Sequence, residues 1–247
     1  MVSVMQVLLV ATFLGVWEFA ASAGVIDAFI VSSPSRMIKT FFLMTQSDLT
    51  VHILYTVGET LAGFIIGVIL GFFMAVGLWY SDFASRVAAP FLVVANSLPK
   101  IALGPVIIVW AGAGISAIIT MAVAISLIVT VMELSHGFYA TDNNMMVTVQ
   151  SFGADKGEIF RKVVIPYNIP VLFQSLKVNI GLSLVGVIAG EFLVSKAGLG
   201  YLIVYAGQVF KMDLVMMSVV LLVFIAFVMY SAVNGLEKLA VKMINHI

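Results

Sequence analysis

The sequence predicts an all-α protein that crosses a lipid bilayer about six times. Of its 247 residues, 62% are hydrophobic and only 10% are charged, whereas a typical soluble domain is about half apolar and about a quarter charged. The apolar residues form runs long enough to cross the hydrocarbon core, which takes roughly 20 residues per helix. Backbone groups in lipid must be satisfied within the protein, and these runs are too long for barrel strands, so each run is predicted to be a helix. We therefore expect one membrane domain over residues 1–247.

The apolar runs give the expected crossings in chain order. The first run lacks the positively charged start of a signal peptide and is longer than its apolar part, so we expect it to be retained. The predicted crossings are Val2–Ala23, Val51–Trp79, Pro90–Ala111, Ile115–Leu134, Val171–Val194 and Leu214–Val233. Pro99 and Pro105 predict that the third crossing is kinked or unwound near Lys100.

Two shorter segments are predicted to lie at the membrane surface. Ser33-Pro34-Ser35 has the composition of a helix start, and this helix is expected to run through Phe42. Residues 196–213, KAGLGYLIVYAGQVFKMD, are too polar and too often interrupted by glycine to cross. An interfacial or re-entrant segment is expected there.

The Lys and Arg residues predict which side of the membrane the termini occupy. Six crossings place both termini on one side, and cationic residues are enriched on the cytoplasmic side. The side with the termini carries Arg86, Lys156, Arg161, Lys162, Lys238 and Lys242, and the opposite side carries Arg36, Lys39, Lys196 and Lys211. This distribution favours cytoplasmic termini.

Several functional classes are excluded. The net charge is zero and no basic block is present, so nucleic acid is not an expected partner. The chain has no cysteine for a thiolate site, and His52 and Glu59, two turns apart on one predicted helix, lack the further ligands of a metal site. Ser, His and Asp are too scattered for a nucleophilic triad, and no G-x4-G-K-[ST] sequence is present. The chain is not expected to be an enzyme, to hydrolyse ATP alone or to bind a cofactor.

The densest cluster of charge, SFGADKGEIFRKVVIPYNIP at residues 151–170, lies between the fourth and fifth crossings. Just before it, a short helix is predicted to begin at one of three consecutive cap residues, Thr141, Asp142 or Asn143. Its apolar face would carry residues spaced by four and three positions, Met145, Val149 and Phe152.

A second short helix is predicted after Gly153, which suits the left-handed position that follows a helix. Asp155 can cap it, with Glu158 three residues later as the partner in an acidic capping box. Pro166 is expected to end it, since proline is not tolerated inside a helix. Both helices are too short and too charged to enter lipid. Their apolar side chains could be covered by the cytoplasmic ends of this chain or by a protein partner.

The spacing of this loop resembles the coupling loop of permease subunits of binding-protein-dependent ABC importers. Gly153, Val163, Ile165 and Pro166 match the family pattern G-x9-I-x-L-P, SFGA is similar to the usual SLGA, and VVIPYNIP is similar to VVLPAALP. Further similarities are SSPS at 32–35, SLPKIALGPVIIVWAG at 97–112 and GEFLVSKAGLGYLI at 190–203. Together they cover nearly the whole chain, and they are most similar to the nitrate, sulfonate, taurine and bicarbonate branch.

The resemblance implies a type I ABC importer permease whose coupling loop, about residues 136–169, sits in a groove of a cytoplasmic ATPase subunit. The coupling residues that it implies are Val149, Phe152, Gly153, Ala154, Asp155, Ile165 and Pro166. Where the family usually has Glu-Ala-Ala, this chain has Val147, Thr148 and Val149. Shape and apolar contact are therefore expected to carry the docking.

The resemblance also implies an assembly in the cytoplasmic (inner) cell membrane. Its members would be two ATPase subunits that bind ATP and Mg, a second permease subunit that could be an identical copy, and an extracytoplasmic substrate-binding protein. The predicted function is the membrane-spanning subunit of an ATP-driven importer that passes a small solute delivered by that binding protein.

Ionisable residues inside predicted crossings are candidates for the translocation pathway, since such groups usually face a cavity or each other. The candidates are Glu59, Lys100 and Glu191. Lys100 could attract an anionic substrate; alternatively, it reaches the cytoplasmic face or neutralises Glu191. Small residues at helical spacing are instead expected to serve helix packing, namely Gly63, Gly67, Gly71, Gly186 and Gly190.

Two other functional classes are weighed against the importer. An ion- or proton-coupled secondary transporter would show inverted repeats and paired broken helices, whereas only one strongly broken crossing is predicted here. A membrane scaffold would need the charged loop but no cavity.

Overall fold

The computed structural model describes residues 2–244, which are helical except for short turns and form no strand. The all-α prediction is therefore confirmed. Five helices are long and apolar enough to cross a bilayer, namely α1 (Val2–Ser22), α4 (Leu49–Tyr80), α7 (Ile115–Tyr139), α11 (Ile169–Val194) and α13 (Met212–Ile244). A sixth crossing is present if a bent pair of helices is taken as one span.

The bent pair is the third predicted crossing. α5 (Asp82–Ser97) is followed by a single 3-10 turn, η1 (Lys100–Leu103), and by α6 (Gly104–Ala111), and the direction changes by 86° at the break. The break lies at Leu98, whose ψ of 138° is extended, because a residue that precedes proline is pushed out of the helical region. α5 begins earlier than the predicted Pro90, since the Ser81 hydroxyl caps it by accepting the Ala84 N–H.

The centre of the bundle is formed by α4, α7 and α11, which approach closely along small residues. Three glycines of α4 each lie against one small residue of α7, in the pairs Gly63 with Ala122, Gly67 with Ser126 and Gly71 with Thr130. Two glycines of α11, Gly186 and Gly190, lie against Ala122 and Ile118 of α7. The α4 glycines leave room for the small side chains of α7, and the α11 glycines let the two backbones approach. Such close van der Waals packing drives helix association in lipid.

The remaining crossing, α13, packs along α11 and carries the shorter helices of one end of the bundle. These are α2 (Ala28–Val31), α3 (Pro34–Thr45) and α12 (Leu199–Gln208). α3 begins at the predicted Pro34 and continues past Phe42 to Thr45. α12 has only 10 residues, too few to cross, which confirms that the segment 196–213 does not span.

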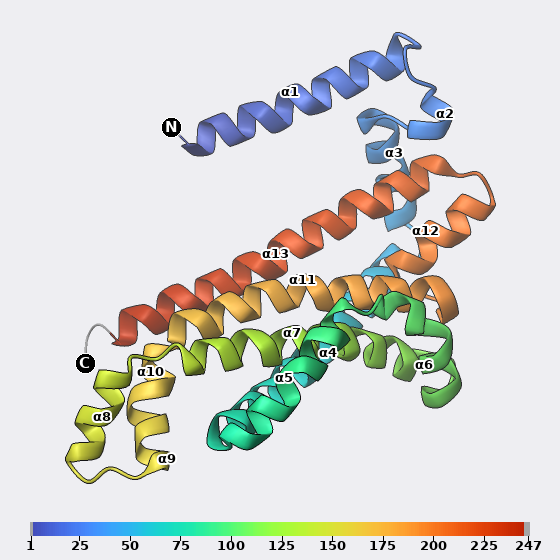
Figure 1. The fold of residues 1–247 in the computed structure, drawn as a ribbon. Helices are drawn as coiled ribbons and strands as arrows, with labels where there is room; N and C mark the ends of the chain where they lie inside the picture. Colours follow the sequence, from blue (N-terminus) through green and yellow to red (C-terminus); the bar gives the residue numbers. More distant parts are fainter. Residues whose placement is uncertain (1, 245–247) are drawn as a thin grey trace.

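The short helices of the charged loop lie at the opposite end. They are α8 (Asn143–Ser151), α9 (Lys156–Ile159), the π-helical turn η2 (Phe160–Val164) and α10 (Ile165–Tyr167). Figure 1 shows them toward the same end as the first turn of α1 and the last turn of α13, whereas α2, α6 and α12 lie toward the other end. This arrangement is the one expected for an even number of crossings.

The first helix, α1, stands apart from the bundle (Figure 1) and packs mainly on α2 and α3. Its connection to α3 is polar, because the Glu18 carboxylate accepts the Ser35 N–H at 2.9 Å and the Ser35 hydroxyl at 2.8 Å. Large apolar side chains such as Phe13 and Phe19 point outward. A helix with this surface is suited to lipid contact.

Candidate functional site

The first helix of the charged loop begins at Asp142. The Asp142 carboxylate accepts the Asn144 N–H at 2.8 Å, so it is the cap among the three predicted residues. After α8, Gly153 has φ +88°, which is the predicted left-handed conformation. A Cβ at Gly153 would meet no atom within 4 Å. The backbone conformation alone therefore favours glycine there.

The second helix begins with the predicted capping box. The Asp155 carboxylate accepts the Glu158 N–H at 2.7 Å, and the Glu158 carboxylate accepts the Asp155 N–H at 3.3 Å. Lys162 donates to Glu158 at 2.7 Å. This hydrogen bond, followed by that from the Asp155 N–H, lowers the pKa of the Glu158 carboxyl. The helix start is thus fixed by three local polar contacts.

Pro166 does not end this helix, contrary to the prediction. The helical path continues through η2 and α10 to Tyr167. In a regular helix the proline ring would clash with the carbonyl four residues earlier. Here the preceding turn is widened, since the Ile165 N–H bonds to the Phe160 carbonyl five residues back. Pro166 then falls in the first turn of α10, where its missing N–H costs little.

Aromatic side chains fix the second helix to two crossings. The Phe160 ring lies 4.8 Å from the Trp79 ring at the end of α4 and 5.4 Å from the Phe138 ring at the end of α7, measured between centroids. Lys156 adds a polar contact, since its ammonium donates to the Tyr80 carbonyl at 3.0 Å. A movement of this helix would therefore be passed to both α4 and α7.

A buried asparagine that the sequence analysis missed closes the loop at its base. The Asn168 side-chain amide donates to the Thr141 hydroxyl at 2.8 Å and to the Val164 carbonyl at 2.9 Å. Thr141 precedes the first helix and Asn168 follows the second, so the bond ties the two ends of the loop together. The only signal in the sequence is an asparagine between Pro166 and Pro170 in an otherwise apolar stretch.

The first helix presents an apolar surface to the outside. The Phe152 side chain is 86% exposed, and Met145 and Val147 are about half exposed. Of the expected coupling residues, three are half-buried against this chain, namely Val149, Ala154 and Ile165. The other four are exposed, namely Phe152, Gly153, Asp155 and Pro166. The chain therefore leaves part of the predicted docking face uncovered.

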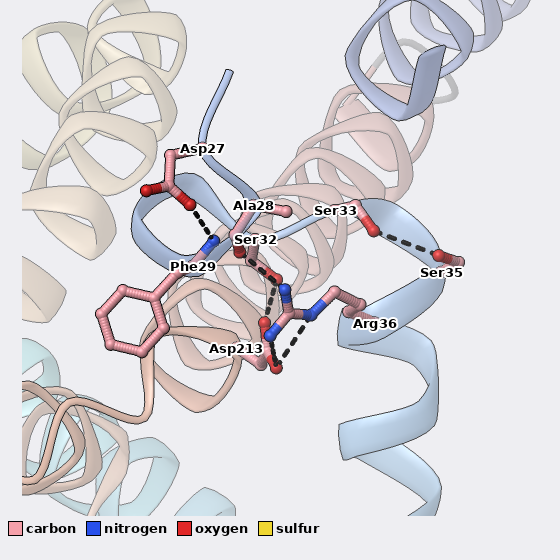
Figure 2. A network of polar contacts seen from close by, with 8 residues as sticks. All are labelled: Asp27, Ala28, Phe29, Ser32, Ser33, Ser35, Arg36 and Asp213. Carbon is pink, nitrogen blue, oxygen red and sulfur yellow. Dashed lines mark hydrogen bonds and ion pairs between the residues drawn. The ribbon is translucent and has the colours of Figure 1, made fainter. Parts of the chain in front are cut away.

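The opposite end of the bundle is held by a polar network between α3 and α13 (Figure 2). The Arg36 guanidinium donates to Asp213 Oδ2 through two nitrogens, at 2.9 and 3.2 Å, and to the Ala28 carbonyl at 2.9 Å. The Ser32 hydroxyl donates to Asp213 Oδ1 at 2.7 Å. Ser32 itself has φ +60°, a conformation that costs a residue other than glycine free energy. The Asp213 carboxylate thus secures both the strained turn and the start of α13.

The three pathway candidates have different surroundings. Glu191 is 1% exposed, and its carboxylate accepts the Thr56 hydroxyl at 2.6 Å. Glu59 is 5% exposed and lies beside the Glu191 carboxyl, and neither Glu59 oxygen has a donor in the described part of the chain. Lys100 is partly exposed, and its ammonium donates to the backbone and side-chain oxygens of Asn96 at 3.2 Å. The expected alternative in which Lys100 neutralises Glu191 is not seen within residues 2–244.

Comparison with known families decides the class of protein. A family model described as "Binding-protein-dependent transport system inner membrane component" matches residues 67–245, well over half of the chain. The chain belongs to this family. It is the permease subunit of an ABC importer for a small solute, and the family is one of transporters and not of enzymes. Nothing in the comparison favours the secondary transporter.

Curated relatives agree over most of their length. An ABC transporter permease protein of Haemophilus influenzae is 26% identical over 93% of both chains. The riboflavin transport system permease protein RibX of Chloroflexus aurantiacus is 26% identical over 92% of this permease and 85% of its own chain. The aliphatic sulfonates transport permease protein SsuC of Escherichia coli is 25% identical over 83% of this permease and 79% of its own chain. The expected relation to the sulfonate branch is thereby supported.

A solved structure shares the fold. The match is to an inward-facing MetNI methionine ABC transporter, with a TM-score of 0.69 and 18% identity over 77% of this chain and 94% of that chain. At this identity the match shows the fold alone, which is that of a type I importer permease.

Proposed function

We propose that the two short helices of the charged loop are the contact through which a separate cytoplasmic ATPase drives this permease. The observation that carries the proposal is Phe152, 86% exposed at the tip of α8, on a loop that Phe160 fixes to α4 and α7. Exposed aromatic residues often dominate the free energy of an interface. A rigid helix pair attached to two crossings can transmit a rigid-body rotation of the partner.

The assembly that fits this role contains two ATPase subunits, which bind ATP and Mg, a second permease subunit that is a copy of this chain, and an extracytoplasmic binding protein. We place it in the cytoplasmic membrane with both termini on the cytoplasmic side. The excess of Lys and Arg on the end with the charged loop supports that orientation. The second permease copy would cover apolar surface left open along the bundle.

The solute is proposed to be small and delivered by the binding protein. Relatives carry the names of riboflavin and aliphatic sulfonate transport systems, which differ widely in charge and shape. We therefore propose that the binding protein, and not this permease, sets most of the specificity.

The proposal is tested with Phe152→Ala in the full chain, co-expressed with the ATPase subunit that is encoded beside it in the genome. We expect the amount of ATPase that co-purifies to fall by about tenfold or more, since truncation of a central aromatic residue commonly costs an interface more than 1 kcal/mol. Phe29→Ala is the matched control, because Phe29 is also exposed but belongs to α2, which lies at the opposite end (Figure 1). Equal co-purification of both variants with the ATPase, or uptake that persists on an ion gradient without ATP, would contradict the proposal.

A further inference from the structure

The start of α12 is built around side chains of α4 and α11. The backbone N–H groups at a helix start have no partner within the helix. Three of them are bonded to side chains, Gly198 to His52 Nδ1 at 3.0 Å, Leu199 to Thr56 Oγ1 at 2.8 Å and Gly200 to Glu191 Oε2 at 2.5 Å. The start of α12 is thereby held by two of the crossing helices.

Glu191 is the centre of this network. Its Oε1 accepts the Thr56 hydroxyl, and its Oε2 accepts the Gly200 N–H. Thr56 in turn accepts the Leu199 N–H, so one hydroxyl joins the carboxylate to a second amide of α12. A carboxylate at a helix N-terminus is also stabilised by the helix dipole.

The glycines of the G-L-G sequence leave space for this carboxylate. A Cβ at Gly200 would lie 2.7 Å from Glu191 Oε2, and a Cβ at Gly198 would overlap the carboxyl group. Gly198 also has φ +107°, which disfavours any other residue. The adjoining carboxyl of Glu59 makes no such contact with α12, and it has no donor in the described range. The two buried carboxyls therefore differ in role.

α4 connects this network to the opposite end of the molecule. Thr56 lies near the start of α4, and Trp79, which packs against Phe160 of the charged loop, lies near its end. α4 is one uninterrupted helix of 32 residues. A displacement of the charged loop can thus reach α12 through a single rigid element.

We propose that Glu191 is a positioning residue and not a substrate ligand, and that its carboxylate, with Thr56, latches α12 across the extracytoplasmic end of the bundle. Loosening this latch opens that end, and α4 links the latch to the charged loop. Two parts of this inference rest on the proposed function: that this end of the bundle faces the extracytoplasmic side, and that α12 closes the translocation pathway there. The latch itself is tested without ATP or a partner.

The absence of cysteine from the chain allows the test to use single thiols. Leu202→Cys places a thiol on the buried side of α12, and Tyr205→Cys places one on its exposed side. Each is introduced into the full chain in sealed right-side-out vesicles and treated with a membrane-impermeant maleimide. Thr56→Val is compared with the matched control Thr60→Val. Thr60 is equally buried, but its hydroxyl donates to the Thr56 carbonyl of its own helix and, within the described residues, to no other helix.

We expect Thr56→Val to speed labelling of the Leu202→Cys thiol by about tenfold or more, since it removes the Thr56 partner of Glu191 Oε1 and of the buried Leu199 N–H. Thr60→Val should leave the labelling rate near that of the parent. Equal rates in the two variants would overturn the latch. Failure of the Tyr205→Cys thiol to react from outside would instead overturn the sidedness, and so distinguish failure of the proposed function from failure of the latch.

Substitution of Glu191 separates positioning from substrate contact. Gln can still accept the Gly200 N–H and donate to Thr56, whereas Leu can do neither. We expect labelling of the Leu202→Cys thiol to be fastest with Glu191→Leu, intermediate with Glu191→Gln and slowest in the parent. If both variants label like the parent while the affinity for transported solute falls, Glu191 is a substrate ligand and the proposal is wrong.

Discussion

At Gly153, the constraint on residue type comes from the backbone and not from the space around it. A side chain there would point into open space, but φ +88° is strained for residues with a Cβ and most strained for β-branched ones. The joint between the two short helices therefore depends on one dihedral angle.

We expect Gly153→Val to uncouple transport from ATP hydrolysis. Strain of about 1–3 kcal/mol would shift the joint away from its native angle and so misplace Phe152 relative to the ATPase. The measurement is uptake per ATP hydrolysed in reconstituted vesicles. Gly153→Asn is the control, because asparagine tolerates the left-handed region. Wild-type uptake by the valine variant would count against a coupling role for this residue.

At the scale of the elements, glycines decide how closely the central helices pack. The glycines of α4 lie against small side chains of α7, and Gly186 and Gly190 of α11 lie against its backbone. Glycine at two positions of the same helix can consequently have very different importance. Gly186 faces the α7 backbone, whereas Gly181 faces open space.

We predict that Gly186→Ala destabilises the protein and that Gly181→Ala does not. The new Cβ at Gly186 would lie 2.5 Å from the Ala122 Cα, and backbone cannot move aside cheaply, so a loss of about 1–3 kcal/mol is expected. At Gly181 the same change should be neutral or stabilising, since alanine is the better helix former. Thermal unfolding of the two variants in detergent gives the comparison. Similar melting temperatures would show that α7 and α11 do not approach closely at Gly186.

At the scale of the whole molecule, a few polar contacts join segments that lie far apart in the sequence. Arg36 and Asp213 connect α3 to α13, and Glu18 connects α1 to α3. Because α1 contacts the rest of the chain mainly through α2 and α3, the Glu18 contacts restrain where α1 lies, whereas the Arg36–Asp213 pair restrains the start of α13. The Arg36 side chain is 44% exposed, so water weakens its ion pair with Asp213, whereas Ser32 is buried and depends more on its hydrogen bond to the carboxylate.

Asp213→Ala is expected to cost more than Arg36→Lys. The first change removes the acceptor of both Arg36 and Ser32 and leaves the strained Ser32 turn unsupported, a loss of about 1–3 kcal/mol. The second keeps one charge-assisted bond and should cost less than about 1 kcal/mol. Melting temperatures measured in the same detergent decide the order. A larger loss for Arg36→Lys would mean that the guanidinium contact to Ala28, and not the Asp213 carboxylate, holds the turn.

The local features of the charged loop were predictable because their causes are local. Asp142, Gly153 and the Asp155–Glu158 capping box act on neighbours within a few residues, and all are found as expected. The continuation of the helical path through Pro166 was not predictable, since the wide turn that accommodates the proline depends on how Phe160 packs against α4 and α7. Asn168 was missed for the same reason, because its partner Thr141 is 27 residues away.

The sequence by itself determined the membrane class, the helical fold, the crossings other than the exact form of the third, and the two short helices of the charged loop. These follow from apolar length and from local capping, neither of which requires knowledge of distant residues. Only the tertiary structure decided what the buried polar side chains contact. Glu191 and Glu59 look alike in the sequence, but Glu191 accepts hydrogen bonds from α4 and α12, whereas Glu59 has no donor among residues 2–244. The difference arises from which helix turns face each other, and that is fixed by close packing across the whole bundle.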